Sequence, residues 1–168
     1  MEGAQVPGDE RGSLLAVDLG LRTGLAVYGR DGRLRSYRSQ NLGSRSRLRR
    51  AASRIVGSYR PLEALIVEGD AGLARVWGRE GARAGLQVHV VAPERWRASL
   101  LHPREYRDGP TAKRSADRLA RAVIVWSEAD QPTTLRHDAA EAICIGLYGV
   151  LVLGWLEQLP PSLNPSRR

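Results

Sequence analysis

The sequence predicts an α/β domain in which a five-stranded mixed sheet is flanked by helices. Short apolar, β-favouring runs separated by glycine turns come first, and the later apolar runs alternate with segments of helical periodicity. An antiparallel meander followed by alternating strands and helices is typical of a mixed sheet. At 168 residues the chain is long enough for one such domain to bury its core without disulfides or a structural metal.

Three antiparallel strands are expected at residues 14–18, 24–28 and 34–38. The first two are joined through Gly20 and Thr23-Gly24, and the third follows the turn signal Asp31-Gly32. These strands form the meander.

A helix is expected from Ser44, where the apolar spacing changes to a helical period. Its apolar stripe consists of Leu48, Ala51, Ala52, Ile55, Val56 and Tyr59. Its arginines lie largely on the other faces, at Arg45, Arg47, Arg49, Arg50 and Arg54. This basic face fits a solvated surface and a DNA-facing surface equally well.

The middle of the chain predicts a central parallel strand at 64–68, a helix at 71–84 and a strand at 86–91. Asp70 is expected to cap the helix. Leu73, Val76 and Trp77 are expected to face inward, and Arg75, Arg79 and Arg83 outward.

The rest of the domain is predicted to be mainly helical. We expect a short helix or turn at 93–101 carrying Trp96, and a polar loop at 102–110. A helix is expected to start at or near Thr111, followed by a connection at 127–136. A last helix over 137–156 is apolar on nearly every face after Glu141, so it should be buried.

The folded unit is therefore expected at residues 13–157, with a flexible segment at 1–12 and a C-terminal tail at 158–168. The longest uncharged run, 142–156, is shorter than the roughly 18 to 20 residues that a membrane span needs. The lone Cys144 reads as a small buried side chain, and no signal-peptide pattern is present at the start. These features predict a cytoplasmic protein without a membrane partner.

The charge balance favours a polyanionic partner, because the formal net charge is +8. Nucleic acid fits this charge better than an acidic small molecule does. Arginine supplies all but one of the 26 basic residues, with Lys113 the exception. A GC-rich genome would produce the same bias, although the planar guanidinium also suits phosphate.

Four acids stand where they can meet. Asp18 and Glu68 end apolar strands, and neighbouring strand ends converge in a mixed α/β sheet. Asp138 and Glu141 are three residues apart in the first turn of the last helix, on the same face. Taken singly, such acids are ordinary turn residues or partners of the helix dipole.

Together, the four acids imply a compensating cation, because like charges brought together in a buried site are unfavourable. An all-oxygen donor set suits Mg²⁺ or Mn²⁺, and the sequence offers no zinc-type cluster of cysteines and histidines. Two such ions about 4 Å apart can support phosphodiester cleavage.

Three motifs resemble those of the RuvC family of Holliday junction resolvases, within the RNase H-like superfamily. They are Ala16-Val-Asp-Leu-Gly followed by Thr23-Gly-Leu-Ala, Leu65-Ile-Val-Glu68, and His137-Asp-Ala-Ala-Glu-Ala142. The resemblance covers roughly residues 13–155, with matching order and spacing of the acids. The segment Glu141–Gly149 looks closer to the small RuvC-like resolvases of the chloroplast and bacterial type.

The resemblance implies an RNase H-like fold with Asp18, Glu68, Asp138 and Glu141 as catalytic metal ligands for two Mg²⁺ or Mn²⁺ ions. Glu141 stands where classical members have Asp. The implied reaction leaves a 5′ phosphate, and symmetric nicking of a four-way junction implies a homodimer.

The resemblance also implies that Lys113 lies near the cleaved phosphate. The sequence further suggests that Arg22, Arg75, Arg79, Arg83 and Arg114 contact the DNA backbone. His137 is a candidate for positioning water or the scissile phosphate. The alternative, which is the more common role of such a residue, is that it caps the helix.

One departure concerns junction opening, because Ala71 stands where classical members place an aromatic wedge and the chain has no phenylalanine. Leu73, Trp77, Trp96 and Tyr106 are the alternatives for stacking on unpaired bases. Burial in the core is the expected fate of the tryptophans.

The sequence therefore predicts a metal-dependent, structure-specific endodeoxyribonuclease that resolves four-way (Holliday) DNA junctions by paired nicks. A junction-binding module without cleavage is one alternative, but a pure polyanion binder gains nothing from an acidic cluster. A transposase or recombinase catalytic domain would need further domains. An actin-like sugar kinase would need a second nucleotide-binding lobe.

Overall fold

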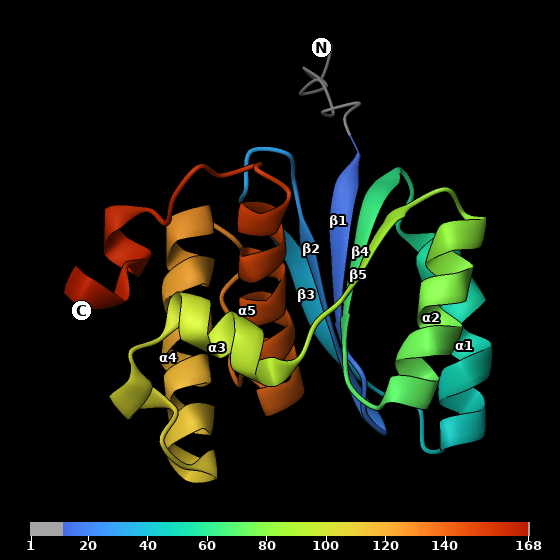
Figure 1. Cartoon of the computed structure of the whole chain (residues 1–168), viewed down its shortest axis with the longest axis horizontal. Helices are drawn as coiled ribbons and strands as arrows, with labels where there is room; N and C mark the ends of the chain where they lie inside the picture. Colours follow the sequence, from blue (N-terminus) through green and yellow to red (C-terminus); the bar gives the residue numbers. More distant parts are fainter. Residues whose placement is uncertain (1–11, 168) are drawn as a thin grey trace, which may run out of the picture.

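The computed structural model describes residues 12–167 and has three layers. A five-stranded sheet lies between helices α1 and α2 on one face and α3, α4 and α5 on the other (Figure 1). Except for Gly12, the predicted flexible segment 1–12 lies outside the described residues. The prediction of an α/β domain with a mixed five-stranded sheet is confirmed.

The sheet has the order β3-β2-β1-β4-β5. Strands β1 (Ser13–Asp18), β2 (Arg22–Tyr28) and β3 (Leu34–Asn41) form the antiparallel meander. Strands β4 (Leu62–Glu68) and β5 (Gln87–Val90) follow, with β4 parallel to β1 and β5 parallel to β4. β3 extends beyond its predicted end because its last residues are polar and pair at the sheet edge, where an apolar signal is absent.

Helices α1 (Arg45–Ser58) and α2 (Ala71–Arg83) cover one face, and both begin at side-chain caps. The Ser44 hydroxyl accepts a hydrogen bond from the Arg47 amide, and Asp70 accepts from the amides of Gly72 and Leu73. The predicted apolar stripe of α1 is buried from Leu48 to Val56. The predicted inward residues of α2 face the core: Leu73 and Trp77 are buried, and the half-buried Val76 packs against the same cluster. Ala74 and Gly81 are buried as well.

Helices α3 (Pro93–Leu100), α4 (Gly109–Ser127) and α5 (His137–Val152) cover the other face. α4 begins earlier than predicted, because Asp108 accepts a hydrogen bond from the Thr111 amide and Pro110 fits the first turn. α5 ends before its predicted limit, where Gly154 takes a left-handed φ of 70°. A short 3₁₀ turn, η1 (Pro103–Glu105), interrupts the predicted polar loop.

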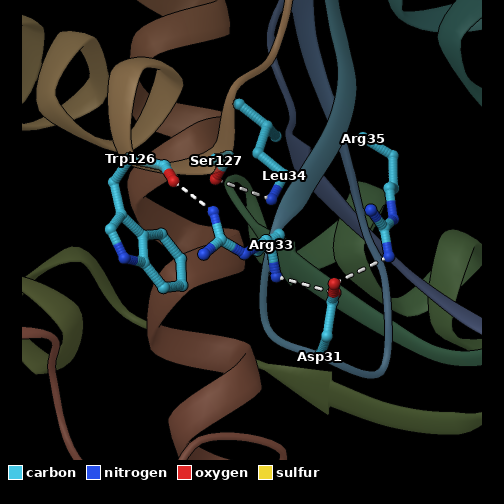
Figure 2. Close-up of polar contacts among 6 residues, drawn as sticks. All are labelled: Asp31, Arg33, Leu34, Arg35, Trp126 and Ser127. Atoms are coloured by element: carbon cyan, nitrogen blue, oxygen red, sulfur yellow. Dashed lines mark hydrogen bonds and ion pairs between the residues drawn. The ribbon is translucent and has the colours of Figure 1, made fainter.

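The β2–β3 hairpin is tied to the C-terminal end of α4 (Figure 2). The Arg33 guanidinium donates to the Trp126 carbonyl and lies 4.7 Å from the centroid of the indole ring, and the Leu34 amide donates to the Ser127 hydroxyl at 3.0 Å. Asp31 accepts from the Arg33 amide and pairs with Arg35. These contacts join the hairpin to α4 at one end of the domain, and β1 and β4 end at the opposite end (Figure 1).

The predicted tail at 158–168 contributes to the core. Two 3₁₀ turns, η2 (Pro161–Leu163) and η3 (Pro165–Arg167), follow α5, and Leu163 is fully buried in the core beneath α4. The packed unit therefore extends past residue 157. Within residues 12–167, no helix is both long and apolar enough to cross a membrane.

Candidate metal centre

The candidate site lies at the edge of the sheet where two parallel strands end. Asp18 and Glu68 are register partners at the ends of β1 and β4. Helix α5 begins at the same edge and supplies Asp138 and Glu141 from its first turns (Figure 1). The predicted convergence of strand ends and helix start is therefore present.

Three of the four predicted ligands form a compact group. Asp18, Glu68 and Glu141 each offer a carboxylate oxygen, and these oxygens lie within 4.8 Å of one another. Glu68 and Glu141 are buried, with exposed fractions of 7% and 8%, and Asp18 is half-buried. Three carboxylates from two strands and one helix thus share one small volume.

Gly24 explains how α5 comes so close to the sheet. It pairs with Asp18 across β1 and β2, and a Cβ atom added to it would lie 1.9 Å from the Asp138 carbonyl oxygen. The sequence placed the start of this strand at Gly24 with Thr23 in the turn, but β2 begins at Arg22. The Thr23 hydroxyl instead closes the turn by donating to the Gly20 carbonyl at 2.8 Å.

Asp138 stands apart from the three-acid group among the described residues. Its negative charge nevertheless contributes to raising the pKa of Asp18, so it lies near this residue. Its Oδ2 atom is buried and has no hydrogen-bond partner within the described part of the chain. An unpartnered buried carboxylate oxygen is costly unless a cation or water completes it.

The electrostatics of the group favour protons or a metal. Burial raises the pKa of Asp18 to about 8, and the negative charges of Glu141, Glu68 and Asp138 act in the same direction. Burial also raises the pKa of Glu68 to about 7, against the opposing effect of a hydrogen bond from Trp96. At neutral pH the ionised cluster therefore needs a compensating cation.

Two consecutive residues of α3 contact the cluster, and the sequence predicted neither contact. The Trp96 indole N–H donates to Oε2 of Glu68 at 2.5 Å, and the ring is fully buried. Arg97 donates to Oε1 of Glu141 at 3.1 Å, and its own Nε atom is buried without a partner among the described residues. No sequence signal identifies these contacts, because they depend on how the chain after β5 folds back over the strand ends.

The remaining predicted site residues lie around the cluster or farther away. His137 Nε2 is 3.5 Å from Oε1 of Glu141. Lys113 and Arg114 are exposed near the start of α4, which begins at the same edge as α5 (Figure 1). Neither forms an ion pair with the four acids in the described structure. Arg22 is exposed at the start of β2.

The arginines of α2 lie on the opposite face of the sheet from α5. Arg75, Arg79 and Arg83 are exposed on its outer side, and Arg83 pairs with Glu80 at 2.9 Å. Of the alternatives for base stacking, Leu73, Trp77 and Trp96 are buried in the core. Tyr106 is half-buried between η1 and α4.

A mixed sheet in this order, with acids at two central strand ends and at the start of the covering helix, defines the RNase H-like class. No protein-family model matches the sequence, and no curated protein sequence matches it significantly. The structure is similar to that of T. thermophilus RuvC in complex with Holliday junction substrate, with a TM-score of 0.54 and 19% sequence identity. The match covers 86% of this chain and 98% of that chain. The chain therefore has the fold of RuvC, as the sequence motifs implied.

Proposed function

We propose that the chain is a divalent-metal-dependent endonuclease that resolves four-way DNA junctions by paired nicks. The main support is the group of three acids in a RuvC-like fold, with Asp18 and Glu68 at strand ends and Glu141 near the start of α5. The likeness to a RuvC bound to a Holliday junction supports branched DNA as the substrate class. The net charge of +8 supports a polyanionic substrate independently.

The residues present fit Mg²⁺ or Mn²⁺. The donors are carboxylate oxygens, burial raises the pKa values of Asp18 and Glu68, and Asp138 has a buried oxygen with no hydrogen-bond partner among the described residues. When bound, such divalent ions would activate a water and stabilise the leaving 3′ oxygen. Asp18, Glu68 and Glu141 would hold the ions, and Asp138 would complete the set.

The chain's own residues orient the reactants around this centre. Trp96 fixes one oxygen of Glu68 and leaves the other free for coordination. Arg97 is paired with Glu141 at 3.1 Å, so its guanidinium is positioned to take a phosphate oxygen when the substrate arrives. Lys113, which is exposed on α4, and His137, which lies beside Glu141, are further candidates for contact with the scissile phosphate.

A junction-binding module without cleavage is disfavoured by the same cluster. Buried carboxylates repel a phosphate backbone and cost folding free energy, so a pure binder would gain nothing from them. Paired nicks on opposite strands require two active sites, and we propose that a homodimer provides them.

The test uses a labelled mobile four-way junction, the matching duplex and the single strands, each with Mg²⁺, Mn²⁺ or EDTA. We expect metal-dependent nicks on the junction alone, loss of cleavage in Asp18→Asn and Lys113→Gln cleaving more slowly. Asp117→Asn is the matched control, because this acid is ion-paired with Arg121 on the surface of α4. Junction binding without cleavage in either metal would refute the proposal.

A further inference from the structure

Helix α1 has a basic face with no acidic residue of its own helix to compensate it. Five exposed arginines lie along it, and the helix contains no acidic residue: Arg45, Arg47, Arg49, Arg50 and Arg54. Arg45 and Arg49 are one turn apart, as are Arg50 and Arg54, so like charges are neighbours. Basic residues in the first turn also oppose the helix dipole. This arrangement is unfavourable for the protein alone and favourable with an anion bound.

The basic face continues onto α2 through a shared groove. Arg45 and Arg49 of α1 and Arg75 and Arg79 of α2 line a hollow between the two helices, with Gly72 in its wall. A Cβ atom added at Gly72 would lie 3.2 Å from Oδ1 of Asp70, so a side chain there would crowd the carboxylate that caps α2. Asp70 pairs with Arg45 at 3.0 Å and is the single acid in contact with these four arginines among the described residues.

The groove lies at the same edge of the domain as the candidate metal centre. Helices α1 and α2 both begin where β1 and β4 end, on the face of the sheet opposite α5 (Figure 1). The positive ends of both helix dipoles therefore point toward the edge at which Asp18 and Glu68 lie. A nucleic acid backbone that passes this edge meets the carboxylates on one side and the arginines on the other.

We propose that the groove of Arg45, Arg49, Arg75 and Arg79 is a second DNA contact site, which binds backbone phosphates of a duplex arm away from the cleaved bond. The inference rests on the proposed function for the identity of the ligand. Guanidinium groups match phosphate oxygens in pairs, and such contacts add affinity and orientation without base readout. The sequence predicted that Arg75 and Arg79 contact the DNA backbone, and the groove adds Arg45 and Arg49 of α1 to the same proposed site.

The test measures binding of a labelled four-way junction by fluorescence anisotropy over a salt series, with Ca²⁺ in place of Mg²⁺. The groove variant is Arg49→Gln with Arg79→Gln. Each lost phosphate contact lowers the slope of log affinity against log salt by about 0.9, so the double variant should lower it by about 1.8. Thermal melting of the groove variant at low salt should show no loss of stability, because like charges have been removed.

The matched control is Arg35→Gln with Arg121→Gln, which removes the same charge from residues paired with Asp31 and Asp117 elsewhere on the surface. The control should keep the wild-type salt slope. Equal salt slopes in wild type, groove variant and control would refute the proposed DNA contact in the groove. Equal reductions of the salt slope in the groove variant and the control would refute it as well. Because binding is read without cleavage, failure of the nuclease proposal appears separately, as an uncut junction in Mg²⁺.

Discussion

The indole N–H of Trp96 donates a 2.5 Å hydrogen bond to Oε2 of Glu68, at the end of the strand that borders β1. A fully buried ring thereby fixes the orientation of a carboxylate that the proposed function uses as a metal ligand. A hydrogen bond of this kind orients a metal-binding side chain and restricts its rotation before the metal binds.

Trp96→Phe should lower the affinity for Mn²⁺ and Mg²⁺ by about tenfold or more, because the ring packing is kept and the hydrogen bond is lost. Isothermal titration calorimetry measures the affinity. The matched control is Trp77→Phe, since Trp77 is equally buried and its Nε1 has no partner among the described residues. Equal losses of affinity in both variants would show that Trp96 acts through packing alone.

Arg97→Gln should not lower metal affinity. Removing the guanidinium 3.1 Å from Oε1 of Glu141 removes a competing cation, so metal affinity should rise or stay constant. The cleavage rate at saturating metal should fall by about 100-fold, because the proposed contact of Arg97 with a phosphate oxygen is lost. Arg95→Gln on the same helix is the control, because Arg95 is exposed. A proportional loss of metal affinity and rate would contradict this role.

The metal-free protein should become less stable as the pH rises. The folded-state pKa of Asp18 is raised from 3.8 to about 8 and that of Glu68 from 4.5 to about 7. At a pH between its unfolded-state and folded-state pKa, each carboxyl group is protonated in the folded protein and ionised in the unfolded one. In that range, each group lowers the free energy of unfolding by up to about 1.4 kcal/mol for every unit by which the pH rises.

Melting temperatures in EDTA should therefore fall from pH 5 to pH 8. Added Mg²⁺ should reverse the fall at pH 8, and Asp18→Asn should flatten it. A melting temperature in EDTA that is the same across this range in wild type and variant would show that the cluster does not hold protons.

Gly24→Ala should destabilise the fold and weaken metal binding together. The new Cβ would lie 1.9 Å from the Asp138 carbonyl oxygen, so α5 must move away from β2. Overpacking of this kind costs about 1–3 kcal/mol in the free energy of unfolding. Chemical denaturation and calorimetry measure the two effects.

The control for this change is Gly57→Ala in α1, where a Cβ meets nothing within 4 Å. This substitution should stabilise the protein by up to about 1 kcal/mol, because alanine favours the helix. Metal affinity unchanged in Gly24→Ala would mean that the close approach of α5 does not determine the geometry of the cluster.

The sheet and the convergence of acids could be predicted because their signals are local. Apolar runs ended by Asp18 and Glu68 marked two strand ends, and parallel strands bring such ends together. Helix periodicity predicted Asp138 and Glu141 at the start of α5, where both are buried. Asp138 does not belong to the group of carboxylate oxygens that lie within 4.8 Å of one another. This depends on tertiary distances, which helix periodicity does not predict.

The contacts of α3 could not be predicted, because Trp96 and Arg97 acquire partners only through the path of the chain after β5. Gly24 was predicted at the junction of turn and strand, and its close contact with α5 gave no separate signal, because glycine marks turns and close approaches alike. The role of Leu163 in the core was hidden in a segment rich in proline and polar residues.

The most direct test of the account uses a supercoiled plasmid that carries an inverted repeat extruded as a cruciform. A resolvase nicks both strands of the junction within one binding event and produces linear plasmid. We expect Mg²⁺-dependent linear product from the wild-type protein, none from Asp18→Asn, and none from a plasmid without the repeat. Equal cutting of both plasmids, or no metal-dependent product from either, would contradict junction resolution by the acidic centre.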